Sequence, residues 1–280
     1  MYPNLSKLGS TIQNFTQLNK TCGYDQGIPL TSLNKNKLPR EMTMFRFVQI
    51  ASLSLAITCV ALFAASCGSS SQSQVRVVHA IPDGLPLDIE VNTTKVFTDV
   101  AFDTFQPATG YTKTASGSVT FQAFDTGTTT NPLFPNGNST NLSGSSQYTE
   151  ILTGFVAAPS LLSVTDNNAA PTAGNIEFRI IHASPSGSTP VDIYIVPPGT
   201  NISGLTPQIA ALAYTQASSY VGLAFAANGY AVVVTPSGNQ TPLVNQVYTP
   251  PTGSIRTLVL VDTQGGGNMS NTPVLLNDLN

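Results

Sequence analysis

The sequence predicts an all-β protein that contains two tandem antiparallel β-sandwiches. The first observation is a repeated motif, because residues 75–82 read VRVVHAIP and residues 178–185 read FRIIHASP. The second is the short alternation of apolar and polar residues after residue 75, which is typical of strands with one buried face. The third is the regular recurrence of turn residues, while no stretch after residue 75 keeps helical spacing over three turns.

The chain opens with a polar segment, residues 1–43, that contains several lysines and does not fit a sandwich. Met42 or Met44 is the better translation start. We interpret the segment as a mis-assigned start, or as a long leader that is removed, and exclude it from the fold. Cys22 belongs to this segment.

Residues 44–66 have the order of a secretory signal: a basic start at Arg46, an apolar centre, and small residues at the end. This end resembles the lipobox of bacterial lipoproteins, in which the signal peptide is cleaved before a cysteine that carries lipid. Ser66 fits that pattern, although Ala64 stands where leucine is usual. The resemblance implies lipidation at Cys67. Cys59 is a poorer candidate, because it follows a threonine.

An uncleaved transmembrane helix is the alternative, since residues 47–66 are long enough to span a bilayer. Either way, the following residues are expected outside the cytoplasm. Gly68 follows the cysteine, and in lipoproteins of two-membrane bacteria this implies sorting to the outer membrane. Residues 67–74 contain the lipidated cysteine and a serine- and glutamine-rich stretch, which predicts a flexible tether.

The first sandwich is predicted over residues 75–168 and the second over 175–280, with linker composition between them. Alternation at Val119, Phe121 and Ala123 indicates a half-buried strand, whereas residues 231–234 form a buried apolar run. Many short strands with regular turns favour an immunoglobulin-like sandwich. One helical turn is compatible with residues 207–214.

The repetition extends beyond the opening motif. Asp88-Ile89-Glu90-Val91 matches Asp192-Ile193-Tyr194-Ile195, and Gly117 matches Gly229. On these motifs residues 75–280 resemble tandem copies of the domain of unknown function 4397 (DUF4397), which is common in bacterial envelope proteins. The resemblance implies a fold and an envelope location, but no activity, since the function of the family is not established.

Charge excludes one class of partner. Without residues 1–66 the chain keeps five basic and twelve acidic residues, a net charge of −7. Nucleic-acid binding requires clustered Lys and Arg, so we expect no nucleic-acid partner. Only Cys67 then remains among the cysteines, so no intramolecular disulfide can form and the fold depends on apolar burial.

The two histidines of the chain, His79 and His182, each precede an aspartate, Asp88 and Asp192, across a turn. Our interpretation is structural: each imidazole hydrogen-bonds the neighbouring carboxylate or the turn backbone. A metal site normally needs three or four ligands, so it would require a further carboxylate such as Asp83 or Glu90.

The repeated arginines, Arg76 and Arg179, are expected to form salt bridges or to pack on the sandwich face, with binding of a carboxylated ligand as the alternative. Asp99 and Asp103 are candidate paired carboxylates for glycan chemistry. Their counterparts are Ala211 and Thr215, which weakens a role shared by both copies.

Catalytic motifs such as Gly-x-Ser-x-Gly, His-Glu-x-x-His and a phosphate-binding Gly-Lys-Ser/Thr loop are absent from the sequence. We therefore expect no cofactor and a non-enzymatic envelope lipoprotein that serves adhesion, glycan contact or protein assembly. The alternative is an enzyme, or enzyme subunit, acting on envelope glycans or peptides. An exposed aromatic face, formed by Tyr111, Tyr194 or Tyr220, would favour binding.

Overall fold

The computed structural model describes residues 71–187 and 189–279, in which seventeen strands are the only regular elements apart from turns and bridges. The all-β prediction is therefore confirmed. In this described part no helix has the length and apolar character that crossing a bilayer requires. The predicted leader, signal segment and Cys67 lie outside the described residues.

The first sandwich has two sheets, which we call A and B. Sheet A has the order β4-β1-β8-β9, with β5 also paired to β1, and sheet B has the order β3-β2-β6-β7. The strands are β1 Ser73–His79, β2 Leu87–Val91, β3 Thr94–Val100, β4 Thr104–Gln106, β5 Thr112–Thr114, β6 Gly117–Asp125, β7 Asn138–Leu142, β8 Gln147–Phe155 and β9 Ala158–Thr165.

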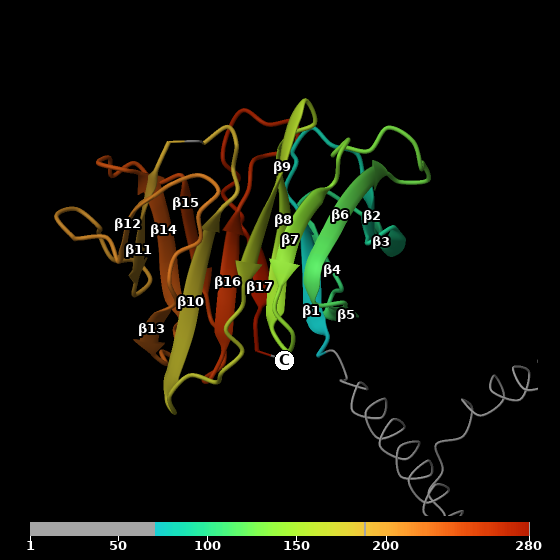
Figure 1. Cartoon of the computed structure of the whole chain (residues 1–280). Helices are drawn as coiled ribbons and strands as arrows, with labels where there is room; N and C mark the ends of the chain where they lie inside the picture. Colours follow the sequence, from blue (N-terminus) through green and yellow to red (C-terminus); the bar gives the residue numbers. More distant parts are fainter. Residues whose placement is uncertain (1–70, 188, 280) are drawn as a thin grey trace, which may run out of the picture. The chain divides into compact units, whose positions relative to one another are not determined.

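The second sandwich also has two sheets. Sheet C has the order β13-β10-β16-β17, and sheet D has the order β12-β11-β14-β15. The strands are β10 Asn175–His182, β11 Val191–Val196, β12 Ile209–Leu212, β13 Val221–Ala224, β14 Tyr230–Pro236, β15 Val244–Tyr248, β16 Ile255–Leu260 and β17 Val274–Asn277. Figure 1 shows the first sandwich in cyan to yellow-green and the second in yellow to red.

The same strand order occurs in both sandwiches, and one pair in each runs parallel where the sequence predicts antiparallel neighbours. These pairs are β1 with β8 and β10 with β16. In each case the chain passes through the other sheet between the two strands, and this long crossover permits a parallel pair.

Two details of the predicted boundaries change. Ser73 and Gln74, which the sequence places in the tether, begin β1 and pair with Thr114 and Lys113 on β5. Residues 207–214, compatible with a helical turn, instead contain β12, which pairs with β11. Pairing with β11 determines the conformation of this segment, because the edge of β11 supplies backbone hydrogen bonds that one short helical turn cannot.

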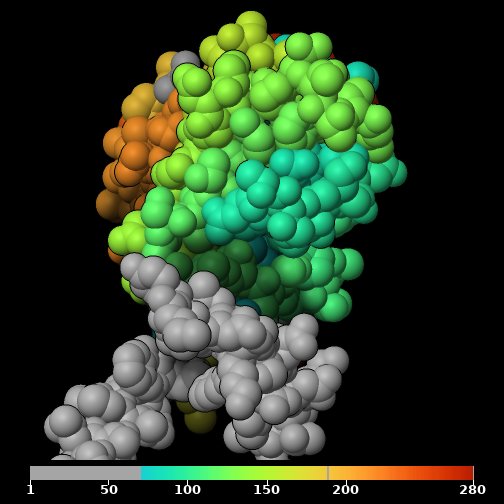
Figure 2. Space-filling model, turned by 45° about the vertical axis from the view of Figure 1, so that its right-hand side comes forward, coloured from blue at the N-terminus to red at the C-terminus, as the bar shows by residue number. Residues whose placement is uncertain are grey.

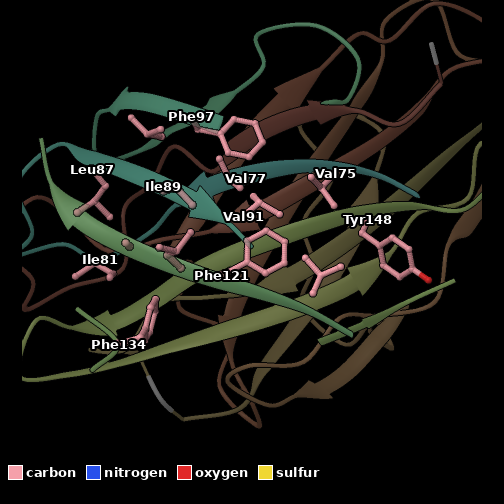
Figure 3. Packing of buried hydrophobic residues seen from close by; sticks show 14 of the residues in the cluster. Val75, Val77, Ile81, Leu87, Ile89, Val91, Phe97, Phe121, Phe134 and Tyr148 are labelled. Carbon is pink, nitrogen blue, oxygen red and sulfur yellow. The ribbon is translucent and has the colours of Figure 1, made fainter. Parts of the chain in front are cut away.

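Each sandwich has its own apolar core. In the first, Phe121 of β6 lies among side chains from β1, β2 and β8, including Val75, Ile89 and Tyr148 (Figure 3). In the second, the core is formed by the corresponding strands, with Phe178, Ile193 and Leu258 among its members. Burial of these side chains is the main favourable contribution to folding.

A third apolar cluster joins the two sandwiches, which belong to one compact unit. It contains Val78 and Ile151 from sheet A and Ile181 and Val259 from sheet C, so the outer faces of these two sheets pack on each other. Sheets A and C are therefore covered on both faces. In the space-filling view the cyan and green residues of the first sandwich face the reader, with orange residues of the second behind them (Figure 2).

The packing of sheet A on sheet C explains why the inner and outer strands differ in their apolar pattern. The inner strands β8 and β16 are buried on both faces and have little alternation, whereas β7 and β15 in the outer sheets alternate between exposed and covered positions. β14 is a partial exception, because Ala231 and Val233 on its outer face pack against Ile202 of the loop between β11 and β12.

Candidate functional site

The two repeated arginines lie in one buried charge network between the sandwiches. Arg76 on β1 and Arg179 on β10 are each 1% exposed. Each Nη2 contacts both Asp166 and Asp278: the Arg76–Asp166 distance is 3.2 Å and the Arg179–Asp278 distance is 3.3 Å. The other two pairs are Arg76–Asp278 and Arg179–Asp166. The formal charges of the two arginines and the two aspartates cancel within the network.

Threonines and tyrosines complete the network in a matched way. Arg76 Nε donates to Thr149 Oγ1 at 2.8 Å, and this hydroxyl donates to Asp166 at 2.6 Å. Arg179 Nε donates to Thr257 at 2.9 Å, and that hydroxyl donates to Asp278 at 2.6 Å. Every carboxylate therefore receives neutral hydrogen bonds as well as charged ones, which a buried ion pair requires.

Two tyrosines lie over the guanidinium groups. The ring of Tyr111 is centred 4.8 Å from Arg76 Cζ, and the ring of Tyr220 is 4.7 Å from Arg179 Cζ. Their hydroxyls donate to Asp166 and Asp278. Burial and the adjacent carboxylate raise the pKa of each tyrosine far above its ordinary value. Tyr194 is buried, and Tyr111 and Tyr220 are half-buried with their rings over the arginines, so these three residues do not form an exposed aromatic face.

Every guanidinium nitrogen of the two arginines already donates to a partner in the chain. Arg76 Nη1 donates to the carbonyl of Asn277 at 2.7 Å, and Arg179 Nη1 donates to the carbonyl of Thr165 at 2.9 Å. Burial alone would lower the pKa of Arg179, but the charges of Asp166 and Asp278 raise it above the ordinary value. The carboxylate partners that the sequence anticipated for Arg76 and Arg179 thus come from the chain itself.

The two histidines hold turn backbone and contact neither Asp88 nor Asp192. His79 Nε2 lies 2.9 Å from the carbonyl of Leu85, and Nδ1 accepts from the amide of Ile81 at 3.3 Å. An accepting Nδ1 is unprotonated, so Nε2 carries the hydrogen and the ring is neutral. Burial lowers the pKa of His79, in agreement with a neutral ring. A Cβ on Gly84 would lie 3.1 Å from the ring, so glycine permits the close turn.

His182 repeats this arrangement. Nε2 lies 3.4 Å from the carbonyl of Thr189, and Nδ1 accepts from the amide of Ser184. Each imidazole meets an aromatic ring edge-on, Phe102 for His79 and Tyr214 for His182. Among the described residues no group of three or more His, Cys, Asp or Glu side chains is placed to hold a metal ion.

The two motif aspartates fix backbone in the outer sheets. Asp88 accepts from the amides of Asp99 and Gly127, at 3.0 and 3.2 Å. Asp192 accepts from the corresponding amides of Ala211 and Gly238, at 2.7 and 3.0 Å. Lys95 Nζ also donates to Asp88, and these donors lower the pKa of Asp88 below its ordinary value.

Asp99 and Asp103, the candidate glycan carboxylates, occupy left-handed backbone positions. Their φ angles are +53° and +62°, and their counterparts Ala211 and Thr215 have φ angles of +50° and +61°. Aspartate tolerates this conformation better than most residues, so a backbone role accounts for both. Burial raises the pKa of Asp103, whose side chain lines a hollow beside β17.

One buried carboxyl has the altered acidity that often marks an active site. Burial raises the pKa of Glu150 on β8 to about 7. Its Oε1 accepts from Ser163 at 2.8 Å, and Oε2 has no hydrogen-bond partner among the described residues. The side chain is fully buried, so no substrate can reach it. The register places Leu258 at the equivalent position of β16.

Surface hollows occur along the edge of the second sandwich. One of about 250 Å³ is lined by Arg76, Phe105, Arg256 and Leu275, together with other residues of the 108–110 loop and β17. A second, of about 290 Å³, shares Arg256 and Leu275 and continues to Val247 and Pro250. These hollows are the accessible concave surface of this region, and Arg76 is the one repeated motif residue in the lining of the two.

Sequence reasoning missed the carboxylates of the network. Asp166 follows β9 and Asp278 follows β17, so each stands directly after the last strand of its sandwich. Extending the alignment of the two halves to their last residues would have paired them. Their shared partners could not be found this way, because they depend on how sheets A and C pack.

Comparison with known proteins gives one family match. Residues 73–194 match the family model described as Domain of unknown function (DUF4397). The match covers the whole first sandwich and continues through β10 into β11, so both copies of the repeated motif, residues 75–82 and 178–185, lie within it. No curated protein matches the chain. Residues 73–194 are therefore similar to a family that has no assigned activity.

Proposed function

We propose that this protein is a non-enzymatic lipoprotein of the cell envelope that presents two DUF4397-type β-sandwiches, related by duplication, for adhesion, glycan contact or protein assembly. One observation carries the proposal: the buried Arg, His and Asp groups of the repeated motifs are engaged in hydrogen bonds and ion pairs within the chain. What remains accessible is a row of mainly apolar hollows, which suits binding.

The matched contacts in the two sandwiches support duplication as their origin. Arg76 and Arg179, Thr149 and Thr257, and Asp166 and Asp278 form pairs in which each member repeats the contacts of the other across the interface. Such reciprocal contacts are typical of a symmetric dimer interface, here between two parts of one chain.

Membrane attachment through Cys67 fits the position of the first strand. Only six residue steps separate Cys67 from Ser73, where β1 begins, and an extended chain of this length reaches about 20 Å. Lipid on Cys67 would hold the sandwiches close to a membrane, and Gly68 favours the outer membrane in a two-membrane cell.

The enzyme alternative has one supporting observation. Asp103 lines a hollow of about 320 Å³, and burial raises its pKa, as would suit a general acid. The backbone role of this position in both sandwiches makes binding the better-supported proposal.

Metabolic labelling tests the lipoprotein proposal. Bacteria that express the full chain are grown with an alkyne fatty acid, and the protein is examined for label and for sedimentation with membranes. We expect label in the wild type and in Cys59→Ala, and its loss in Cys67→Ala, which should also accumulate uncleaved. Label that persists in Cys67→Ala, or a wild type without label, would contradict the proposal.

A further inference from the structure

Three neighbouring hollows lie along β17, and we call them together the β17 groove. The hollow of about 250 Å³ shares Phe105, Ala108 and Leu275 with a hollow of about 320 Å³ at one end. At its other end it shares Arg256 and Leu275 with the hollow of about 290 Å³. The groove therefore follows β17 over its whole length, with the 105–110 segment of the first sandwich as the facing wall.

β17 is an edge strand whose outer side is unpaired. Among the described residues it pairs with β16 alone (Figure 1). Asp278 N donates to the carbonyl of Ile255, so by antiparallel alternation Leu276 and Val274 also face β16. The N–H and C=O groups of Leu275 and Asn277 consequently point into the β17 groove.

Only one of these four backbone groups has a partner in the described residues. The carbonyl of Asn277 accepts from Arg76 Nη1. The amide and carbonyl of Leu275 and the amide of Asn277 remain available. Leu275 itself is 41% exposed, so the edge is accessible. An unprotected strand edge of this kind is a template for another strand.

Arg256 gives the groove a charge. It is half-buried, and no carboxylate lies within ion-pair distance of it among the described residues. Its Nη1 makes both of its hydrogen bonds, to Asn277 Oδ1 and to the carbonyl of Ile255. Nη2 and Nε have no hydrogen-bond partner among the described residues, so they can bind a carboxylate. Asp103 lies at the opposite end, so the groove has a positive and a negative end.

The first sandwich lacks this cation. The register aligns Arg256 of β16 with Tyr148 of β8, which is buried and accepts a hydrogen bond from the amide of Ser143. The charged groove thus belongs to the second sandwich, although the strand order is the same in both.

We infer that the β17 groove binds an extended peptide segment of a partner protein, which adds as a strand to the edge of sheet C and places an acidic side chain on Arg256. Backbone hydrogen bonds to Leu275 and Asn277 supply affinity, and the arginine and apolar walls supply selectivity. Unpaired strand backbone favours a peptide over a glycan, because it matches the spacing of another peptide chain. This inference rests on the proposed binding function and names its ligand class.

Selection from a random peptide library tests the inference. Phage that display random octapeptides are selected on the full chain in detergent micelles, against micelles alone as background. Enriched peptides are then synthesised, and their affinities are measured for the wild type and three variants. Arg256→Gln removes the charge. Leu275→Pro removes one outward N–H, a change that an edge strand tolerates. Lys113→Gln removes an exposed cation elsewhere and is the matched control.

We expect enriched peptides with an acidic residue among β-forming residues. Their affinity should fall at least tenfold in Arg256→Gln and in Leu275→Pro, and stay unchanged in Lys113→Gln, while all variants keep the wild-type melting temperature. No enrichment above micelles, or equal binding by all variants, would overturn the inference. So would preferential binding of oligouronates that requires Arg256 but tolerates Leu275→Pro, because this would identify an acidic glycan.

The same samples separate this inference from the proposed non-enzymatic function. Bound peptides are recovered and weighed by mass spectrometry. Intact peptides are expected. Peptides that bind at the β17 groove and are cleaved would leave the groove assignment standing while replacing the binding module with an enzyme.

Discussion

At the scale of single residues, buried polar groups in this protein fix backbone geometry. His79 and His182 hold turns, and Asp88 and Asp192 hold the left-handed positions of the outer sheets. Each group hydrogen-bonds backbone donors or acceptors of a turn or strand end, and a hydrogen bond of this kind contributes about 0.5–1.5 kcal/mol. Glu150 differs, because one of its oxygens has no partner in the described residues.

Replacing Glu150 by glutamine should stabilise the protein above neutral pH. The pKa of this carboxyl is about 7 in the folded protein against 4.5 ordinarily, so the folded state holds its proton more tightly. Stability is therefore lost as pH rises from about 4.5 through 7. Urea unfolding at pH 8 should show a gain on the order of 1–3 kcal/mol for Glu150→Gln.

The gain should disappear at pH 4.5, where the wild-type carboxyl is protonated in the folded protein. Glu90→Gln, at a half-buried position of β2, is the control and should change stability by less than about 0.5 kcal/mol at both pH values. An equal effect of Glu150→Gln at pH 4.5 and pH 8 would contradict the assigned acidity.

His79→Ala should lower the free energy of unfolding by about 2–4 kcal/mol at pH 7.5, through a cavity and the lost hydrogen bonds to Ile81 and Leu85. Burial lowers the pKa of His79 below 6.5, so wild-type stability should also fall as pH drops below that value. Denaturant unfolding from pH 7.5 to 5 measures both effects. His79→Ala should be less acid-sensitive, and unchanged acid sensitivity would exclude this histidine as a cause.

At the scale of elements, the ends of β9 and β17 are joined to β1 and β10 by the arginine network. Asp166 and Asp278 each form ion pairs with both Arg76 and Arg179. The ends of β9 and β17 are therefore each bonded to one arginine of the first sandwich and one of the second. A buried pair contributes little over a well-packed apolar substitute, but removal of one partner leaves a charge uncompensated. The network consequently selects one packing of sheet A on sheet C.

Arg179→Met should reduce the free energy of unfolding by about 3–5 kcal/mol, because Asp166 and Asp278 lose a shared cation in a buried site. Lys95→Met is the matched control, since Lys95 pairs with Asp88 but its side chain is 38% exposed. It should cost about 0–1 kcal/mol. Chemical denaturation measures both, and similar losses for the two variants would show that the Arg179 network adds nothing beyond a surface pair.

At the scale of the whole molecule, the two sandwiches share an apolar interface as well as a charge network. Val78, Ile151, Ile181 and Val259 lie in it, all fully buried. Further contacts extend along it: Gly265 N donates to the carbonyl of Pro82, and the left-handed Gly266 lies where a Cβ would be 2.8 Å from Phe155. The glycine triplet of the loop between β16 and β17 thus permits close approach to the first sandwich.

We expect both sandwiches to unfold in one transition, because neither can lose its structure without exposing the interface. Ile181→Asp buries a charge there and should split calorimetric unfolding into two transitions or lower the melting temperature by more than about 10 °C. Leu205→Asp, at an exposed position, is the control and should leave one transition near the wild-type temperature. Two transitions in the wild type would contradict this expectation.

Much of the fold followed from local pattern. The duplicated VRVVHAIP and FRIIHASP motifs indicated the matched strands β1 and β10, and alternation at Val119, Phe121 and Ala123 indicated β6. The sequence also allowed the inference that the repeated arginines and histidines have structural roles, because few charged residues follow residue 66. The ion-pair partners of the arginines could not be inferred, because Asp166 lies 90 residues from Arg76 and Asp278 lies 202 residues from it.

The sequence by itself determined an all-β chain with a motif used twice, because the period of side-chain burial and the turn residues are local properties. Only the tertiary structure decided that sheets A and C pack together, that the four charges form one network, and that Phe105 of the first sandwich lies across a groove from the free edge of β17. The physical reason is that these features join residues from different strands, and their contacts exist only once the sheets have been assembled.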